Sequence, residues 1–139
     1  MNFGTYQDNS PRLPALALIV LAGLYLLIGV TGHDPWKTED AIHIGIAHGF
    51  ATQGHWLTPA IAGEPWPHTA PLYHWVAALL GQLLGSVLAF HDAARLATTL
   101  FGALFLVSVS GAAQSFHGDA AGRIAPLLAI GTLGLLVPM

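Results

Sequence analysis

The sequence predicts an all-α integral membrane protein with several membrane-spanning helices and a long outer loop that contains amphipathic juxtamembrane helices. Three observations predict this fold class. Hydrophobic residues make up 54% of the chain and charged residues only 8%, a composition unlike that of soluble domains. The mean hydropathy is +0.62. The few charges are separated by uncharged intervals that are long enough to cross a bilayer.

The first of these intervals, residues 13–32, follows a short polar tail at residues 1–12. At a rise of ~1.5 Å per residue, a helix of this length spans the ~30 Å hydrocarbon core. The interval is longer than the apolar part of a signal peptide and lacks a convincing small-residue cleavage site. We therefore expect an uncleaved first transmembrane helix.

Residues 33–91 are expected to form the outer loop. Charges, prolines and three of the four tryptophans concentrate in its first part, and tryptophan favours the membrane interface. Two juxtamembrane helices are predicted within the loop, at about residues 38–53 and 71–88. The distribution of polar and apolar residues over their faces indicates how each helix is oriented relative to the membrane.

The first juxtamembrane helix has clear start and end signals. Thr38 is expected to cap it, Glu39 and Asp40 lie in its first turn, and Gly54 ends it. One apolar stripe runs along the helix, and we expect the helix to lie flat on the membrane. The stripe consists of Ile42, Ile46 and Phe50.

The second juxtamembrane helix shows a one-sided pattern, with its large apolar residues along one face. The small and polar residues collect on the other face: His74, Gly81, Gln82, Gly85 and Ser86. A lipid-exposed spanning helix need not segregate in this way, so we favour an interfacial or obliquely inserted helix. A true membrane span over the same residues is the alternative.

Two further apolar segments follow the loop. Residues 94–116 carry no charge beyond Arg95 at their start and are long enough to cross the bilayer. Residues 122–139 begin another apolar run, whose uncharged part reaches only ~24 Å as a helix. Because a spanning segment with no exit is an unusual end for a membrane protein, we expect the chain to be the N-terminal fragment of a larger protein.

Charge and residue types exclude some classes of function. The net charge is −3 with four basic residues, so the chain lacks the clustered Lys and Arg of a nucleic-acid-binding surface. With no cysteine, disulfides, thiolate metal sites and a cysteine nucleophile are excluded. The eight histidines and the few carboxylates are left as the available chemistry.

Several short motifs follow one another in a fixed order. They are Thr-Glu-Asp-Ala-Ile-His at 38–43, Gly-His-Trp-Leu-Thr-Pro at 54–59, Gly-Glu-Pro-Trp at 63–66, Ala-Pro-Leu-Tyr-His-Trp at 70–75 and Ala-Ala-Arg-Leu at 93–96. Their order and spacing resemble the start of the lipid-dependent GT-C glycosyltransferases. The closest resemblance is to the aminoarabinose transferase and protein O-mannosyltransferase-like group, and it covers about residues 14–139.

The resemblance implies a GT-C type membrane fold and an inverting glycosyltransferase. Such an enzyme transfers a sugar from a polyprenyl-phosphate carrier to a lipid, glycan or protein acceptor outside the cytoplasm, as in lipid A or glycan modification. Its partners are the polyprenyl-phosphate sugar donor and membrane lipids. The expected location is the bacterial inner membrane, with the outer loop facing the periplasm.

The family has its catalytic carboxylate at the start of the first juxtamembrane helix. The resemblance therefore implies that Asp40 or Glu39 is the general base that takes the proton of the acceptor hydroxyl. Where the family shows Phe-Glu-Lys-Pro, this chain has Pro-His-Thr-Ala at 67–70. His43 or His68 is therefore expected to contact the donor phosphate in place of that lysine.

Two more residues take substrate-binding roles by the same resemblance, Tyr73 and Arg95. Simpler accounts stand beside these roles, because acidic residues also stabilise a helix N-terminus and an arginine can mark a helix end at the lipid headgroups. A divalent metal is a candidate cofactor, since His and carboxylates bind Zn²⁺ or Mn²⁺, but no pair has the spacing of a recognised metal motif. The rival function is a non-enzymatic membrane module, either a transporter half or an assembly subunit, whose loop binds an ion or a partner.

Overall fold

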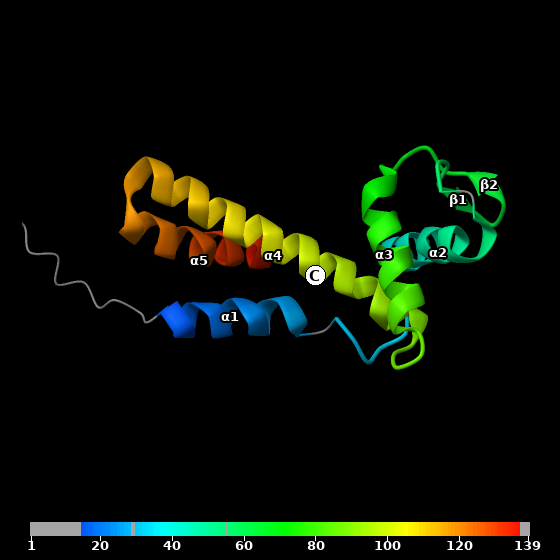
Figure 1. Ribbon diagram of the computed structural model, residues 1–139, viewed down its shortest axis with the longest axis horizontal. Helices are drawn as coiled ribbons and strands as arrows, with labels where there is room; N and C mark the ends of the chain where they lie inside the picture. The colour runs from blue at the N-terminus through cyan, green and yellow to red at the C-terminus, as the bar shows by residue number, and fades with distance from the viewer. Residues whose placement is uncertain (1–14, 29, 55, 137–139) are drawn as a thin grey trace, which may run out of the picture.

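The computed structural model describes residues 15–28, 30–54 and 56–136, and this part of the chain is mostly helical, as predicted. The elements in order are α1 (Ala15–Leu27), α2 (Thr38–Gln53), β1 (Ala60–Ile61), β2 (Glu64–Pro65), α3 (Pro71–Leu84), α4 (Phe90–His117) and α5 (Asp119–Leu136). The molecule is elongated: α2, α3 and the β1–β2 hairpin gather at the N-terminal end of α4, whereas α1 and α5 lie along the rest of α4 (Figure 1). The predicted polar tail lies outside the described residues.

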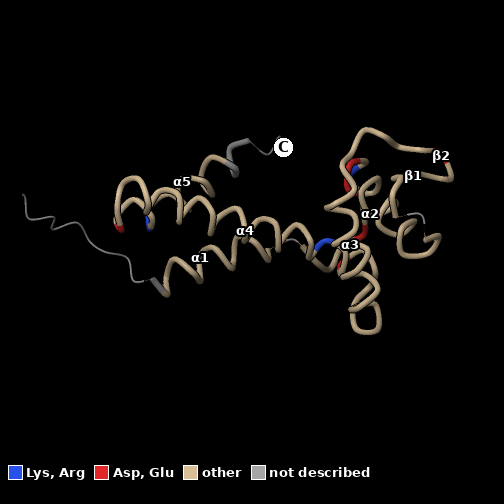
Figure 2. The backbone as a smooth tube through the Cα atoms, turned by 45° about the horizontal axis from the view of Figure 1, so that its top comes forward, with Lys and Arg blue, Asp and Glu red and all other residues tan. Residues whose placement is uncertain are grey.

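α4 is the one helix in the described part of the chain that is long and apolar enough to cross a membrane. Its 28 residues extend ~42 Å, and its most apolar window has a mean hydropathy of 1.8. Charged residues lie near its two ends and are absent from its middle (Figure 2). The helix begins four residues before the predicted start at 94, since Asp92 in its first turn favours a helix N-terminus.

α1 is shorter than the span predicted at residues 13–32. It ends at Leu27, and its 13 residues reach only ~20 Å. The chain then turns, with Gly32 at a φ of +89° and its backbone N–H donating to the Asp92 carboxylate at 3.1 Å. Apolar composition alone predicts a continuous helix here, whereas this contact with α4 holds the chain in a turn.

α2 has the predicted bounds of 38–53. Gly54 ends it in the left-handed conformation, with a φ of +72°, as expected of a C-terminal glycine. The predicted cap is wrong: Lys37 occupies the N-cap position without a side-chain hydrogen bond, and Thr38 lies within the first turn.

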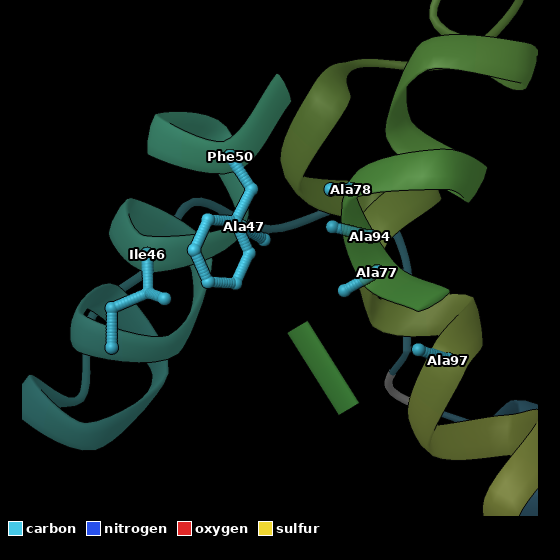
Figure 3. Packing of buried hydrophobic residues seen from close by; sticks show 7 residues of the cluster. All are labelled: Ile46, Ala47, Phe50, Ala77, Ala78, Ala94 and Ala97. Atoms are coloured by element: carbon cyan, nitrogen blue, oxygen red, sulfur yellow. The ribbon is translucent and has the colours of Figure 1, made fainter. Parts of the chain in front are cut away.

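The apolar stripe of α2 packs inside the protein, so the prediction that α2 lies flat on the membrane does not account for this face. Ile46 and Phe50 are buried and, with Ala47, form one cluster with alanines of α3 and α4. Figure 3 shows Ile46 and Phe50 of α2 beside the small side chains Ala77, Ala78, Ala94 and Ala97. Alanine lets helix backbones approach closely, and small residues at helix interfaces are typical of membrane proteins.

α3 packs on the rest of the protein mainly through His74 and small residues. Its buried residues are His74, Ala77, Ala78 and Gly81, whereas Leu72, Leu79 and Leu83 are exposed. His74 and the small residues thus pack against α2 and α4, and Trp75, Val76 and Leu80 are half-buried against the same core, whereas the exposed leucines are left open. An apolar outer face of this kind is typical of a helix that contacts lipid. α3 also ends at Leu84, four residues before the predicted 88, where Gly85 and Ser86 follow.

Close packing at Gly81 leads to a prediction. A Cβ atom added there would lie 2.3 Å from the Phe90 ring, so we expect Gly81→Ala to lower the free energy of unfolding by about 1–3 kcal/mol. The control is Gly45→Ala in α2, where no atom lies within 4 Å and the better helix propensity of alanine is worth about 1 kcal/mol. Thermal unfolding in detergent measures both, and equal midpoints for the two variants would contradict this packing.

α4 and α5 form a helical hairpin around Gly118, which has a φ of +83°. α5 begins three residues before the predicted 122 and contains Pro126. Proline has no N–H to donate to the carbonyl four residues earlier, and that carbonyl, of Gly122, instead accepts a hydrogen bond from Ser110 Oγ at 2.7 Å. The serine hydroxyl thus supplies a donor for the carbonyl that Pro126 leaves without its helical partner.

The β1–β2 hairpin was not predicted. It pairs Ala60 with Pro65 and Ile61 with Glu64, and its two-residue turn places Ala62 and Gly63 at φ values of 52° and 87°. Two positive φ angles are the requirement of a type I′ turn, for which a second-position glycine is well suited. The hairpin packs on α2 and returns the chain to the start of α3.

Candidate functional site

Arg95 lies at the centre of a charged junction near the N-terminal end of α4. Its Nη2 donates to Asp40 Oδ2 at 2.6 Å and its Nε to Asp40 Oδ1 at 3.3 Å, the two-pronged geometry for which a guanidinium is suited. Nη1 donates to Asp92 at 3.2 Å and to the His33 carbonyl at 2.7 Å. The Arg95 side chain is only 8% exposed. It therefore joins α2, α4 and the connection after α1.

A cavity of about 360 Å³ opens beside this junction. Its lining combines an acid, two cations, a hydroxyl and apolar groups, which suits a ligand with both polar and apolar parts. The lining residues are Val30, His33, Trp36, Lys37, Asp40, Arg95 and Thr98. Charged residues of α2, α4 and their surroundings gather at this end of the molecule (Figure 2).

Lys37 supplies a second cation to the cavity. Its ammonium nitrogen lies 5.0 Å from the centroid of the Trp36 ring, within cation–π distance. It forms no ion pair within residues 15–28, 30–54 and 56–136. Unlike Arg95, Lys37 thus has its charge available for an anionic ligand.

A row of aromatic and imidazole side chains lies next to the cavity. Tyr73 shares a hydrogen bond of 2.8 Å with the lining residue Thr98. The ring of His43 meets Tyr73 edge-on, with centroids 5.8 Å apart, and His43 Nδ1 lies 2.9 Å from His74 Nε2. His74 in turn bonds through Nδ1 to the Ala70 carbonyl at 3.2 Å.

The structure brings together four of the six residues singled out by sequence. Asp40 and Arg95 line the cavity, and Tyr73 and His43 lie in the row beside it. Glu39 is exposed and lines none of the described cavities. The sixth, His68, is exposed after β2 and packs edge-on against Trp66 with centroids 5.0 Å apart.

Sequence reasoning missed Asp92, Lys37, Thr98 and the relation of His74 to His43. Asp92 carries a signal, because it stands three residues before Arg95 and such a pair shares a helix face. Lys37 has none beyond its place next to the acidic turn. The other two depend on contacts between separate helices, which spacing along the chain cannot show. In the described part of the chain, no group of three or more His, Asp and Glu side chains is arranged to hold a metal ion.

The sequence motifs that are spread along the loop contact one another in space. The Trp75 indole N–H donates to the Trp56 carbonyl, and the Trp66 backbone N–H donates to the Pro59 carbonyl at 2.7 Å. The ion pair between Asp40 and Arg95 joins the first and last motifs. The motifs, although separate in the chain, therefore lie together in one packed unit.

Burial of His74 makes the stability of this unit depend on pH. His74 is 1% exposed, and its pKa is lowered from the ordinary value of 6.5, chiefly by loss of solvation, against the bond to Ala70 and with a smaller contribution from His43. Below pH 6.5 the unfolded chain takes up a proton that the folded chain resists, so folding loses stability as pH falls.

We therefore expect the midpoint of thermal unfolding in detergent to fall between pH 7.5 and pH 5. His74→Phe, which cannot titrate, should reduce this pH dependence. The exposed His68→Gln is the control and should keep the wild-type dependence. A dependence that is identical in wild type and His74→Phe would show that other groups cause it.

Comparisons with known proteins add no relative: no family model, no curated protein and no solved structure matches this chain.

Proposed function

We propose that this chain forms the donor-site part of a membrane glycosyltransferase that takes its sugar from a polyprenyl-phosphate carrier on the extracytoplasmic face. The observation that carries the proposal is the cavity beside the Asp40–Arg95 pair. It offers a carboxylate and the Lys37 ammonium within one lining, and this ammonium has no ion-pair partner among the described residues. Such a lining suits a reaction between a hydroxyl and a phosphate-linked sugar.

In the proposed reaction, Asp40 is the general base. The acceptor hydroxyl loses its proton to Asp40 as its oxygen bonds to the anomeric carbon. The bond between that carbon and the phosphate oxygen breaks, and the electron pair leaves with the polyprenyl phosphate. Arg95 occupies both Asp40 oxygens, but each carboxylate oxygen has a second lone pair that can take the proton.

Lys37 provides the positive charge that the resemblance assigns to a lysine further along the loop. A lysine is a suitable point charge for a phosphate, and Lys37 lies at the cavity whereas His68 does not. In this proposal the donor phosphate contacts Lys37, and the apolar Trp36 and Val30 contact the start of the polyprenyl chain. The exposed leucines of α3 and the uncharged middle of α4 support a position of the cavity at the membrane surface.

Transfer from a lipid-linked donor tests the proposal. Membranes that contain the full-length protein are incubated with a panel of polyprenyl-phosphate-linked hexoses and pentoses that carry a radiolabel in the sugar. We expect the label to leave the carrier for an acceptor with at least one donor, and matched membranes without the protein to leave it in place. Label that stays on every carrier would overturn the proposal and favour a transporter or assembly subunit.

A further inference from the structure

The two histidines beside the cavity form a hydrogen-bonded dyad between α2 and α3. His43 Nδ1 and His74 Nε2 are 2.9 Å apart, and His74 Nδ1 lies 3.2 Å from the Ala70 carbonyl oxygen. The rings are tilted by 32° with centroids 5.1 Å apart. His74 is buried, whereas His43 is partly exposed.

These two bonds fix the proton on each ring in turn. A carbonyl oxygen only accepts, so His74 Nδ1 must carry the hydrogen, and in the neutral ring Nε2 is then an acceptor. His43 Nδ1 must therefore donate to it, which leaves Nε2 of a neutral His43 with a free lone pair. A buried imidazole resists protonation, so His74 keeps its acceptor nitrogen.

The dyad requires His43 to adopt the tautomer that a histidine side chain usually disfavours. An isolated neutral imidazole carries its hydrogen mainly on Nε2, whereas the buried His74 requires His43 to carry it on Nδ1. The outer nitrogen of His43 is thereby an acceptor. In histidine generally, the hydrogen bond that one ring nitrogen makes determines whether the other nitrogen is a donor or an acceptor.

We propose that His43 Nε2 is a hydrogen-bond acceptor for a hydroxyl group of a bound sugar, with His74 as the positioning residue that fixes its tautomer. The sugar as ligand rests on the proposed function. A hydroxyl donates to a lone pair, whereas a phosphate carries no hydrogen to donate when fully ionised. His43 therefore recognises the sugar and not, as the sequence suggested, the donor phosphate.

The place of His43 agrees with this role. It stands one turn after the cavity residue Asp40 on α2, and residues three apart share a helix face. Its ring meets Tyr73, whose hydroxyl bonds to Thr98 of the cavity lining. Among the described residues, no hydrogen bond to His43 Nε2 is formed that would occupy its lone pair.

Nitrogen-15 NMR of histidine-labelled protein at pH 8 tests the tautomer directly. We expect a protonated Nδ1 and an unprotonated Nε2 for His43, assigned by the loss of its signals in His43→Gln. His74→Phe should return His43 to the Nε2-protonated form. His68→Gln is the control and should leave both signals of His43 unchanged. A wild-type His43 with its hydrogen on Nε2 would overturn the proposal.

Titration with two probes then tests the ligand class. A methyl hexoside or methyl pentoside should shift the His43 Nε2 resonance, and the shift should be lost in His74→Phe. Dimethyl phosphate, a phosphodiester that carries no hydrogen to donate, should leave the resonance in place. A shift with dimethyl phosphate and none with either glycoside would overturn the assignment of a sugar hydroxyl.

The two proposals fail separately. A His43 that shows the expected tautomer and glycoside shift, in a protein that never moves sugar from a polyprenyl carrier, supports the binding site and overturns the enzymatic function. Active transfer together with an Nε2-protonated His43 supports the enzymatic function and overturns the proposed role of His43.

Discussion

Asp40→Asn is expected to abolish sugar transfer while the protein still folds into the membrane. Loss of a general base typically lowers the rate by ~10²- to 10⁴-fold. The asparagine amide has nearly the same size as the carboxylate, and its oxygen can still accept a hydrogen bond from Arg95. The measurement is the initial rate of transfer from the labelled carrier, normalised to the amount of folded protein in the membrane.

Two neighbouring carboxylates are matched controls for this variant. Asp92→Asn also removes a carboxylate partner of Arg95, but Asp92 does not line the cavity. Glu39→Gln changes the adjacent residue, which is exposed. We expect both to transfer at a rate within a few-fold of wild type. If Asp40→Asn and Asp92→Asn lose the same activity, Asp40 acts only as an ion-pair partner.

Arg95→Met is expected to cause the largest loss of stability. It removes the cation that pairs with Asp40 and Asp92, together with the hydrogen bond from Arg95 to the His33 carbonyl. Removing one partner of a buried ion pair costs about 3–5 kcal/mol, and the partial exposure of Asp40 places the expected loss near the lower value. The midpoint of thermal unfolding in detergent measures it.

Arg123→Met and Arg95→Lys provide the comparison. Arg123 is exposed, so its replacement should change the free energy of unfolding by less than about 0.5 kcal/mol. Arg95→Lys keeps the charge but cannot donate to both Asp40 oxygens and the His33 carbonyl in the same fork geometry. Its stability should therefore lie between those of wild type and Arg95→Met. Equal stability of Arg95→Met and Arg123→Met would contradict the role of Arg95 as the link between helices.

Local signals in the sequence predict some elements well. The acidic first turn and Gly54 delimit α2 correctly, because helix ends depend on nearby residues. The end of α1, the end of α3 and the starts of α4 and α5 differ from the predictions by three to five residues, because contacts between helices and turns determine these positions. The bond from Gly32 to Asp92 joins residues 60 positions apart, and no periodicity indicates it.

The buried face of α3 shows a different limit. In a soluble protein the apolar face of an amphipathic helix packs inward, yet the fully buried residues of α3 are His74, Ala77, Ala78 and Gly81. Three of these four are small residues, which let helices approach closely. The same packing places His74 against His43, a contact between two helices that the pattern along α3 alone could not predict.

The candidate site was predicted in part. The resemblance brought forward Asp40, Arg95, His43 and Tyr73, which the structure places around or beside one cavity. The resemblance also implied a phosphate-binding role for His68, because the segment 67–70 replaces a segment of the family that contains a lysine. In the structure, Lys37 lines the cavity and His68 does not. The position of a residue in a motif gives only its order along the chain. His68 follows the β1–β2 hairpin and lies outside the cavity lining.

The most direct test of the account is the side of the membrane on which each end of α4 lies. The chain has no cysteine, so Glu64→Cys and Asp119→Cys each introduce a single thiol, at two exposed positions. A membrane-impermeant maleimide should label residue 64 only from the extracytoplasmic side and residue 119 only from the cytoplasmic side. Labelling of both residues from the same side would contradict a membrane-spanning α4 with the site at its outer end.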